Sequence, residues 1–167
     1  AYVAPDNVVP IAEGTTIEEQ LGSGELAAAV NIKTDNPKFQ PLIENPLEAG
    51  IAAFTDRGHY PINHLIAIRD EVLDANPDLA VALFDAFTES KNRYLEKLKA
   101  GAIENPDAAD RLHARLLELG ANPLPYGIEP NRAVLEELIG HAMTQGILSK
   151  RVPIESLFAA STLDLSG

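Results

Sequence analysis

Two polar segments carry the side chains of this sequence that are best suited to chemistry. The first reads GHYPINHLIAIR over residues 58–69, and the second reads YGIEPNR over residues 126–132. Each joins a turn stiffened by glycine and proline to regular structure, and each holds more ionisable and amide groups than such a connection needs. Together they contain most of what a small anionic ligand requires, so we expect them to converge on one cleft.

His64 is the candidate proton donor of the first segment. The ordinary pKa of an imidazole, ~6.5, suits proton transfer near neutral pH. The alternative is a half-buried histidine whose ring is satisfied by a carbonyl group. His59, His113 and His141 are interpreted as turn, surface or boundary residues. The four histidines contain no i,i+4 pair, so the sequence indicates no metal site.

Arg69 and Arg132 are the candidate anion-binding residues. A guanidinium group can donate two parallel hydrogen bonds to a carboxylate, which a lysine cannot imitate. Arg132 has the stronger case, because it falls in the first turn of an expected helix, where free N–H groups also favour anions. The alternative for Arg132 is an ion pair with Glu129 or Glu136.

The remaining candidate ligand contacts have structural alternatives of their own. Glu129 is more readily explained as a helix cap, and Asn131 fits a cap and a ligand contact equally well. Tyr60 and Tyr126 could bind phenolic oxygens or simply pack with the hydroxyl at the surface. Asn63 completes the set of candidate substrate contacts. The chain has no glycine-rich phosphate loop and no nucleophile elbow.

Composition bounds the class of protein. The 167 residues are 46% hydrophobic and 23% charged, which is typical of one globular domain with a real core. A net charge of −12 argues against nucleic acid and anionic membrane surfaces as partners. No apolar run approaches the ~20 residues of a membrane span. The absence of cysteine excludes disulfides and thiolate chemistry.

The pattern along the chain predicts a mixed α/β fold. Residues 26–32 form a short apolar run typical of a buried, parallel strand, and residues 62–69 are a second strand candidate. Alternation in the second places His64 on one face and Asn63 and Arg69 on the other. Residues 34–46 contain three prolines without a clear period and are predicted to be a loop or crossover linker.

Helix signals surround these strand candidates. A short helix is predicted to open with a capping box, either Thr15/Glu18 or Thr16/Glu19, and to end at Gly22 or Gly24. Asn-Pro-Asp at residues 76–78 and 105–107 starts two more helices, a fourth begins near Pro130, and residues 153–158 form a short helical turn. The expected core positions are Leu79, Leu83, Phe87, Tyr94 and Leu98, then Val134, Leu135, Leu138, Ile139, Ala142 and Met143.

Two strands make a thin sheet, because sheets usually have ~5–6 strands. Either further strands hide in weakly patterned segments such as residues 2–11, or the chain is part of something larger, which we favour. We therefore expect the chain to cover an exposed sheet edge with a second copy, forming a homo-oligomer, or to leave a large apolar surface.

The two polar segments, the helix from Pro77, and residues 145–146 and 155–158 together resemble the C-terminal part of the 4,5-dihydroxyphthalate decarboxylase family. The resemblance extends from about residue 11 to residue 158 and includes SGEL at residues 23–26. The family commonly has an acidic residue at the position of Ala27, so a ligand contact there is not expected. The family is similar in fold to the two-lobed, type II periplasmic solute-binding proteins of ABC importers.

The resemblance implies a C-terminal fragment of an α/β, two-lobed chain. Residues 1–50 would belong to the second lobe with a crossover linker, and residues 51–167 would return to the first lobe. It implies a cytoplasmic carboxy-lyase of aromatic catabolism that needs no organic cofactor and acts on a dihydroxylated aromatic dicarboxylate. The alternative is a solute-binding protein or ligand sensor for a small organic anion, which would be periplasmic. The same scaffold serves both functions, so fold alone does not separate them.

Overall fold

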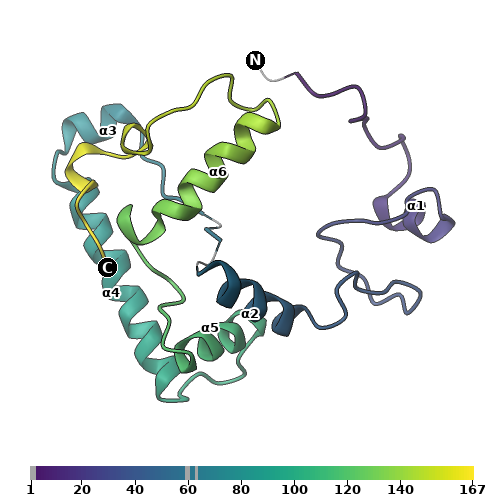
Figure 1. Ribbon diagram of the computed structural model, residues 1–167, viewed down its shortest axis with the longest axis horizontal. Coiled ribbons are helices and arrows are strands. Elements are labelled where there is room, and N and C mark those ends of the chain that lie inside the picture. The colour runs from purple at the N-terminus through teal and green to yellow at the C-terminus, as the bar shows by residue number, and fades with distance from the viewer. Residues whose placement is uncertain (1–2, 59–60, 63) are drawn as a thin grey trace. The chain divides into compact units, whose positions relative to one another are not determined.

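The computed structural model describes residues 3–58, 61, 62 and 64–167, and these residues divide into two units. The first unit extends to Pro46 and the second runs from Leu47 to Gly167. Figure 1 shows that helices are the regular elements of the described chain. None of the described helices is both long and apolar enough to cross a bilayer.

Among its described residues, the first unit contains one helix, α1 (Ile17–Ser23). Thr16 caps it: its hydroxyl accepts from the Glu19 N–H, and the Glu19 carboxylate accepts from the Thr16 N–H. The helix ends at Gly24, which has a left-handed conformation (φ 83°) that glycine adopts without strain. One of the two predicted capping boxes and one of the two predicted stops are therefore confirmed.

The second unit is built from five α-helices among the described residues. They are α2 (Pro46–Arg57), α3 (Asp70–Ala75), α4 (Leu79–Lys99), α5 (Ala108–Glu118) and α6 (Arg132–Thr144). Three short 3₁₀ helices accompany them: η1 (Glu129–Asn131), η2 (Ile154–Leu157) and η3 (Ala160–Thr162). The long helix α4 lies against both α5 and the C-terminal η3 (Figure 1).

The predicted α/β fold is wrong, because the described residues form no sheet. Residues 26–32 and 62–69, expected to be strands, have no strand assignment in their described parts. The β-type pairing that the described chain contains is one isolated antiparallel bridge between Gly127 and Ser166. A strand is stabilised by hydrogen bonds to neighbouring strands and by an opposing layer. Val30 and Ile66 lack that cover and are 86% and 63% exposed.

The helical starts were predicted closely, with a shift of one or two residues. Both Asn-Pro-Asp motifs precede helices, but the residues at the N-cap positions are the aspartates Asp78 and Asp107, of which Asp107 makes a side-chain capping bond and Asp78 makes none. The Asp107 carboxylate accepts a hydrogen bond from the Asp110 N–H, and the Asp107 N–H donates one to the Asp110 carboxylate, which forms a second capping box. The predicted turn of helix at residues 153–158 corresponds to η2. Helices α2 and α3 were not predicted.

The core of the second unit lies between α6 and η2. Its buried members are Ile128, Leu135, Ile139 and Ile154, and Ile62 is among the half-buried side chains that pack against them. Val134 is buried as predicted, whereas Leu138 and Met143 are exposed. Because Ile62 belongs to the first polar segment and Ile128 to the second, this core brings the two segments into contact.

Candidate functional site

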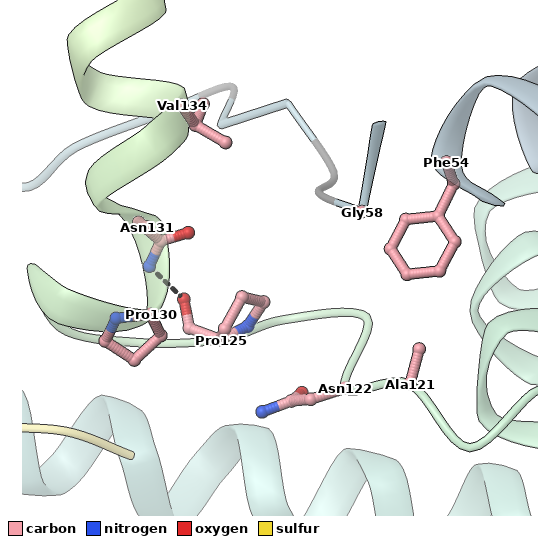
Figure 2. Close-up of a pocket in the computed structure, with 8 residues that line it drawn as sticks. All are labelled: Phe54, Gly58, Ala121, Asn122, Pro125, Pro130, Asn131 and Val134. Carbon is pink, nitrogen blue, oxygen red and sulfur yellow. Dashed lines mark hydrogen bonds between the residues drawn. The ribbon is translucent and has the colours of Figure 1, made fainter. Parts of the chain in front are cut away.

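A half-open pocket of about 270 Å³ lies where the two polar segments approach each other. Its lining residues are Phe54, Gly58, Ala121, Asn122, Pro125, Pro130, Asn131 and Val134 (Figure 2). Gly58 begins the first segment, and Pro130 and Asn131 belong to the second. The pocket is slightly smaller than the ~300–1,000 Å³ typical of small-molecule sites.

Asn131 is the predicted site residue that lines this pocket. It is 7% exposed, and its side-chain Nδ2 donates to the Pro125 carbonyl at 2.7 Å and the Gly127 carbonyl at 2.8 Å. Figure 2 shows the first of these bonds, which joins two of the residues that line the pocket. Both amide hydrogens are thus committed to the backbone turn, so Asn131 shapes the pocket wall and keeps its amide oxygen as the group able to meet a ligand.

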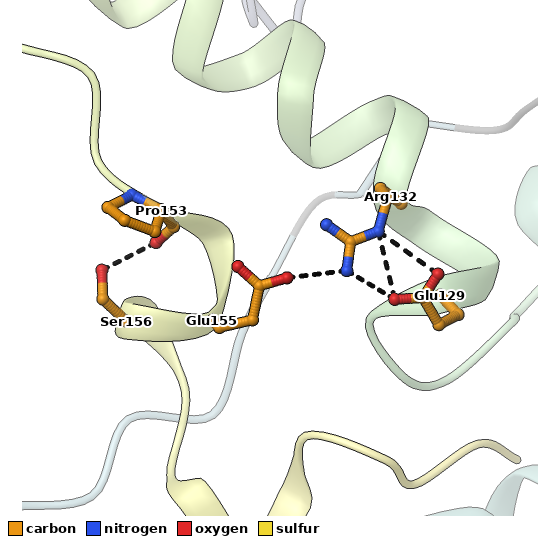
Figure 3. Close-up of polar contacts among 5 residues, drawn as sticks. All are labelled: Glu129, Arg132, Pro153, Glu155 and Ser156. Atoms are coloured by element: carbon orange, nitrogen blue, oxygen red, sulfur yellow. Dashed lines mark hydrogen bonds and ion pairs between the residues drawn. The ribbon is translucent and has the colours of Figure 1, made fainter.

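Arg132 follows Asn131 as the first residue of α6 and is held by two carboxylates (Figure 3). Its Nη2 donates to Glu129 Oε1 at 2.5 Å and to Glu155 Oε1 at 2.7 Å. These bonds raise the pKa of Arg132 and lower the pKa of both glutamates. The ion pair with Glu129 was one alternative in the sequence. A ligand carboxylate can make two parallel hydrogen bonds to this guanidinium only if it displaces one of the glutamates.

The other candidates in the first segment lie in solvent or outside the described residues. His64 is exposed and lies outside any helix or strand of the described residues, so no regular element fixes its ring. Arg69 precedes α3 and pairs with Glu71 at 3.0 Å, with its side chain 77% exposed. Tyr60 and Asn63 fall outside the described residues.

Tyr126 connects the second segment to α4. Its N–H donates to the Gly167 carbonyl at 2.9 Å, and the Gly167 N–H donates back at 3.1 Å. Its ring meets Phe84 edge-on, with the centroids 6.3 Å apart, and Lys91 Nζ lies 5.2 Å from its centroid. The ring is half-buried and therefore packs against α4, which is one of the two roles considered for it.

A second polar cluster, which sequence reasoning did not find, joins α4 to α5. The Tyr94 hydroxyl donates to Asp110 Oδ1 at 2.8 Å and lies 2.9 Å from His113 Nδ1. Burial, then the bond to Asp110, raises the pKa of Tyr94, and burial lowers the pKa of His113. The spacing of Asp110 and His113, three residues apart on one helix face, is the signal that was available.

Lys91 and Glu155 were also missed. Lys91 occupies the apolar stripe of α4, seven residues after Phe84 and four before Leu95, where a charged side chain is unusual. Glu155 gives no local signal, because its partner Arg132 is 23 residues away in the chain. Among the described residues, no group of three or more histidine, aspartate or glutamate side chains is arranged to hold a metal ion.

Comparison with curated proteins finds a distant relative. A protein of Comamonas testosteroni named 4,5-dihydroxyphthalate decarboxylase is 26% identical over 167 residues. This chain is distantly similar to a decarboxylase. The match covers 95% of the chain and 51% of the relative, so the chain spans about half the length of that protein. No protein-family model and no solved structure matches the chain.

Proposed function

We propose that this chain contributes to the decarboxylation of a dihydroxylated aromatic dicarboxylate resembling 4,5-dihydroxyphthalate. The observation that carries the proposal is the extent of the similarity to the Comamonas testosteroni decarboxylase, which covers 95% of the chain and is not confined to one helix. Both polar segments lie within the interval that was expected to resemble such enzymes.

The reaction requires a proton for the ring carbon that loses CO₂. The C–COO⁻ bond breaks, its electron pair stays on the ring carbon, and a proton replaces the lost carboxylate. An electron-rich dihydroxylated ring accepts that proton more readily than benzene does. His64 is the proposed donor, because its exposed imidazole can exchange protons with solvent between turnovers.

The second carboxylate of the substrate needs an anchor that holds the ring in place. Arg132 is the proposed anchor, and substrate binding would exchange the Glu155 carboxylate for that of the diacid. Glu129, three residues before Arg132, would remain as its permanent partner. Asn131, Tyr126 and Arg69 are the proposed secondary contacts among the described residues. Tyr60 and Asn63, which lie outside the described residues, are also proposed contacts.

The test is a decarboxylation assay with 4,5-dihydroxyphthalate, following CO₂ release and the aromatic product. It uses this chain and any longer protein that contains it, with the Comamonas testosteroni enzyme as the positive control. We expect His64→Ala to lower kcat about 10²-fold or more with little change in KM, because a proton donor acts mainly in the transition state. His141→Ala, exposed on α6, is the matched histidine control.

Arg132→Lys should instead raise KM for the diacid, because a lysine cannot make the two-pronged contact. If the control enzyme turns over while neither form of this chain releases CO₂, the proposal fails. Binding of the aromatic acid without turnover, with His64→Ala changing affinity alone, would identify the non-catalytic solute-binding alternative.

A further inference from the structure

The guanidinium group of Arg132 has two edges that can each bind a carboxylate, and a different glutamate meets each of them (Figure 3). Glu129 lies on the edge formed by Nε and Nη2, where it accepts from Nε at 3.1 Å and from Nη2 at 2.5 Å. Glu155 also accepts from Nη2, at 2.7 Å. The two hydrogens of Nη2 point to different edges of the planar group, so Glu155 lies on the edge that Nη1 and Nη2 share. A carboxylate therefore already occupies the edge that a ligand would use.

The contact between Arg132 and Glu155 is open to solvent and is therefore exchangeable. The side chain of Glu155 is 49% exposed, and that of Arg132 is 39% exposed. Ion pairs of this kind are weak, because water screens the charges and two long side chains lose freedom when they pair. The Glu155 carboxylate can rotate into solvent. The place that it leaves has room for another carboxylate, because it holds one already.

The backbone that carries Glu155 is held in place independently of Arg132. Ile154, the preceding residue, is 2% exposed and belongs to the core of the second unit. The Ser156 hydroxyl donates to the Pro153 carbonyl at 2.7 Å, which closes the turn of η2 around Glu155 (Figure 3). When the Glu155 carboxylate leaves Arg132, its backbone stays where it is. The carboxylate is thus tethered beside the guanidinium at a high local concentration and returns when the site empties.

We propose that Glu155 is a built-in competitor of the anion site at Arg132, which lowers the affinity of that site for carboxylate ligands. This inference rests on the proposed role of Arg132 as the carboxylate anchor, and it adds the regulation of that anchor. The apparent dissociation constant of a ligand is the intrinsic one divided by the fraction of molecules in which the site is open. For a weak, exposed pair, this competition raises the apparent constant about two- to sixfold.

The test uses phthalate, an aromatic diacid without ring hydroxyl groups, and nuclear magnetic resonance of ¹⁵N-labelled arginine side chains. At constant ionic strength, phthalate should shift the Arg132 Nε signal saturably, and that signal is assigned by its loss in Arg132→Lys. The Nε signal of Arg93, which forms an exposed pair with Glu89 on α4, should not respond. The titration gives a dissociation constant that does not depend on turnover.

Three variants separate competition from a general effect of charge. Glu155→Gln should lower the dissociation constant of phthalate about two- to sixfold, because a neutral amide competes poorly for the guanidinium. Glu136→Gln is the matched control: it removes the same charge on the next turn of α6, where Glu136 pairs with Arg151, and should leave the constant unchanged. Glu155→Asp keeps the charge but shortens its reach by one methylene group, so it should give part of the gain.

The proposal is overturned if neither Glu155 variant tightens phthalate binding, or if phthalate leaves the Arg132 signal unmoved in Glu155→Gln. It is equally overturned if Glu136→Gln tightens binding as much, because the effect is then one of net charge. Should Glu155→Gln not fold, Glu155→Asp decides the question. If Glu155→Gln tightens phthalate binding while 4,5-dihydroxyphthalate releases no CO₂, the proposed function fails and the competition at Arg132 stands.

Discussion

Arg132 and Glu155 lie 23 residues apart in the chain, and their side chains are joined by a 2.7 Å hydrogen bond between Nη2 and Oε1. The bond ties the first turn of α6 to η2 (Figure 3). Both elements also contribute to the apolar core through Leu135 and Ile154. The candidate anion-binding arginine is therefore part of the packing that holds the C-terminal segment, as well as a candidate ligand contact.

The first prediction concerns pH. Arg132 lowers the pKa of both Glu129 and Glu155, so their contribution to stability is present above the pKa of an unfolded glutamate and is lost as pH falls through the lower folded values. Melting temperatures measured between about pH 6 and pH 3 should decline, and Arg132→Gln should flatten part of that decline.

Arg93→Gln is the control for Arg132→Gln. Arg93 pairs with the single carboxylate of Glu89 on the exposed face of α4, an i,i+4 pair of small energy. If the two variants alter the pH profile equally, the link between α6 and η2 contributes nothing particular to stability.

The second prediction concerns the buried amide of Asn131. Replacing Asn131 with alanine leaves the carbonyls of Pro125 and Gly127 without their donor, which should lower the free energy of unfolding by about 1–3 kcal/mol. Asn131→Asp should cost more, because a carboxylate would face two carbonyl oxygens. Urea denaturation measures both, with the exposed Asn92→Ala on α4 as control. Equal stability of Asn131→Ala and Asn92→Ala would contradict the role given to these bonds.

The third prediction concerns Gly127. Its φ of 107° is one that other residues rarely adopt, and a Cβ there would collide with the Leu165 carbonyl oxygen and lie 3.1 Å from Ser166 Cα. Gly127→Ala should therefore break the bridge to Ser166 and loosen residues 163–167. Amide hydrogen exchange at Tyr126 and Gly167 should accelerate. Gly140→Ala, with open space at its Cβ inside α6, should leave that exchange unaltered.

The fourth prediction concerns the cluster of Tyr94, Asp110 and His113. Burial depresses the pKa of His113 although Asp110 and Asp107 oppose the shift, so folding favours the neutral ring. Stability linked to this ring is present above the pKa of an unfolded histidine and is lost as pH falls through that value towards the folded one. His113→Gln should remove this loss between about pH 7.5 and pH 5.5. A profile identical to that of the unmodified chain would contradict the assignment.

Helix ends were readable from the sequence because they depend on neighbours three or four residues away. The capping box of Thr16 with Glu19 and the stop at Gly24 require only local hydrogen bonds and one left-handed residue. The same holds for the start of α5 after Asn-Pro-Asp, where Asp107 and Asp110 satisfy each other. Such signals act within one turn, so they survive whatever the rest of the chain does.

The strand predictions were wrong because a strand does not depend on local sequence alone. Residues 26–32 and 62–69 have the apolar pattern of strands. That pattern indicates only which side chains a segment could bury, and burial requires a second surface to pack against them. Val30 and Ile66 meet no such surface in the described chain and remain exposed. The membership of Ile62 in the core of α6 and η2, by contrast, came from packing that no periodicity indicated.

The sequence by itself determined which side chains are available: a histidine and two arginines on two polar segments, and helices that begin and end at capping residues. Tertiary structure alone decided their partners. It pairs Glu155 with Arg132, makes the Asn131 amide donate to two backbone carbonyls, and buries Lys91 over the face of the Tyr126 ring. The physical reason is the distance along the chain over which each interaction acts. Capping and helix propensity act over a few residues, whereas ion pairing and burial join residues that only folding brings together.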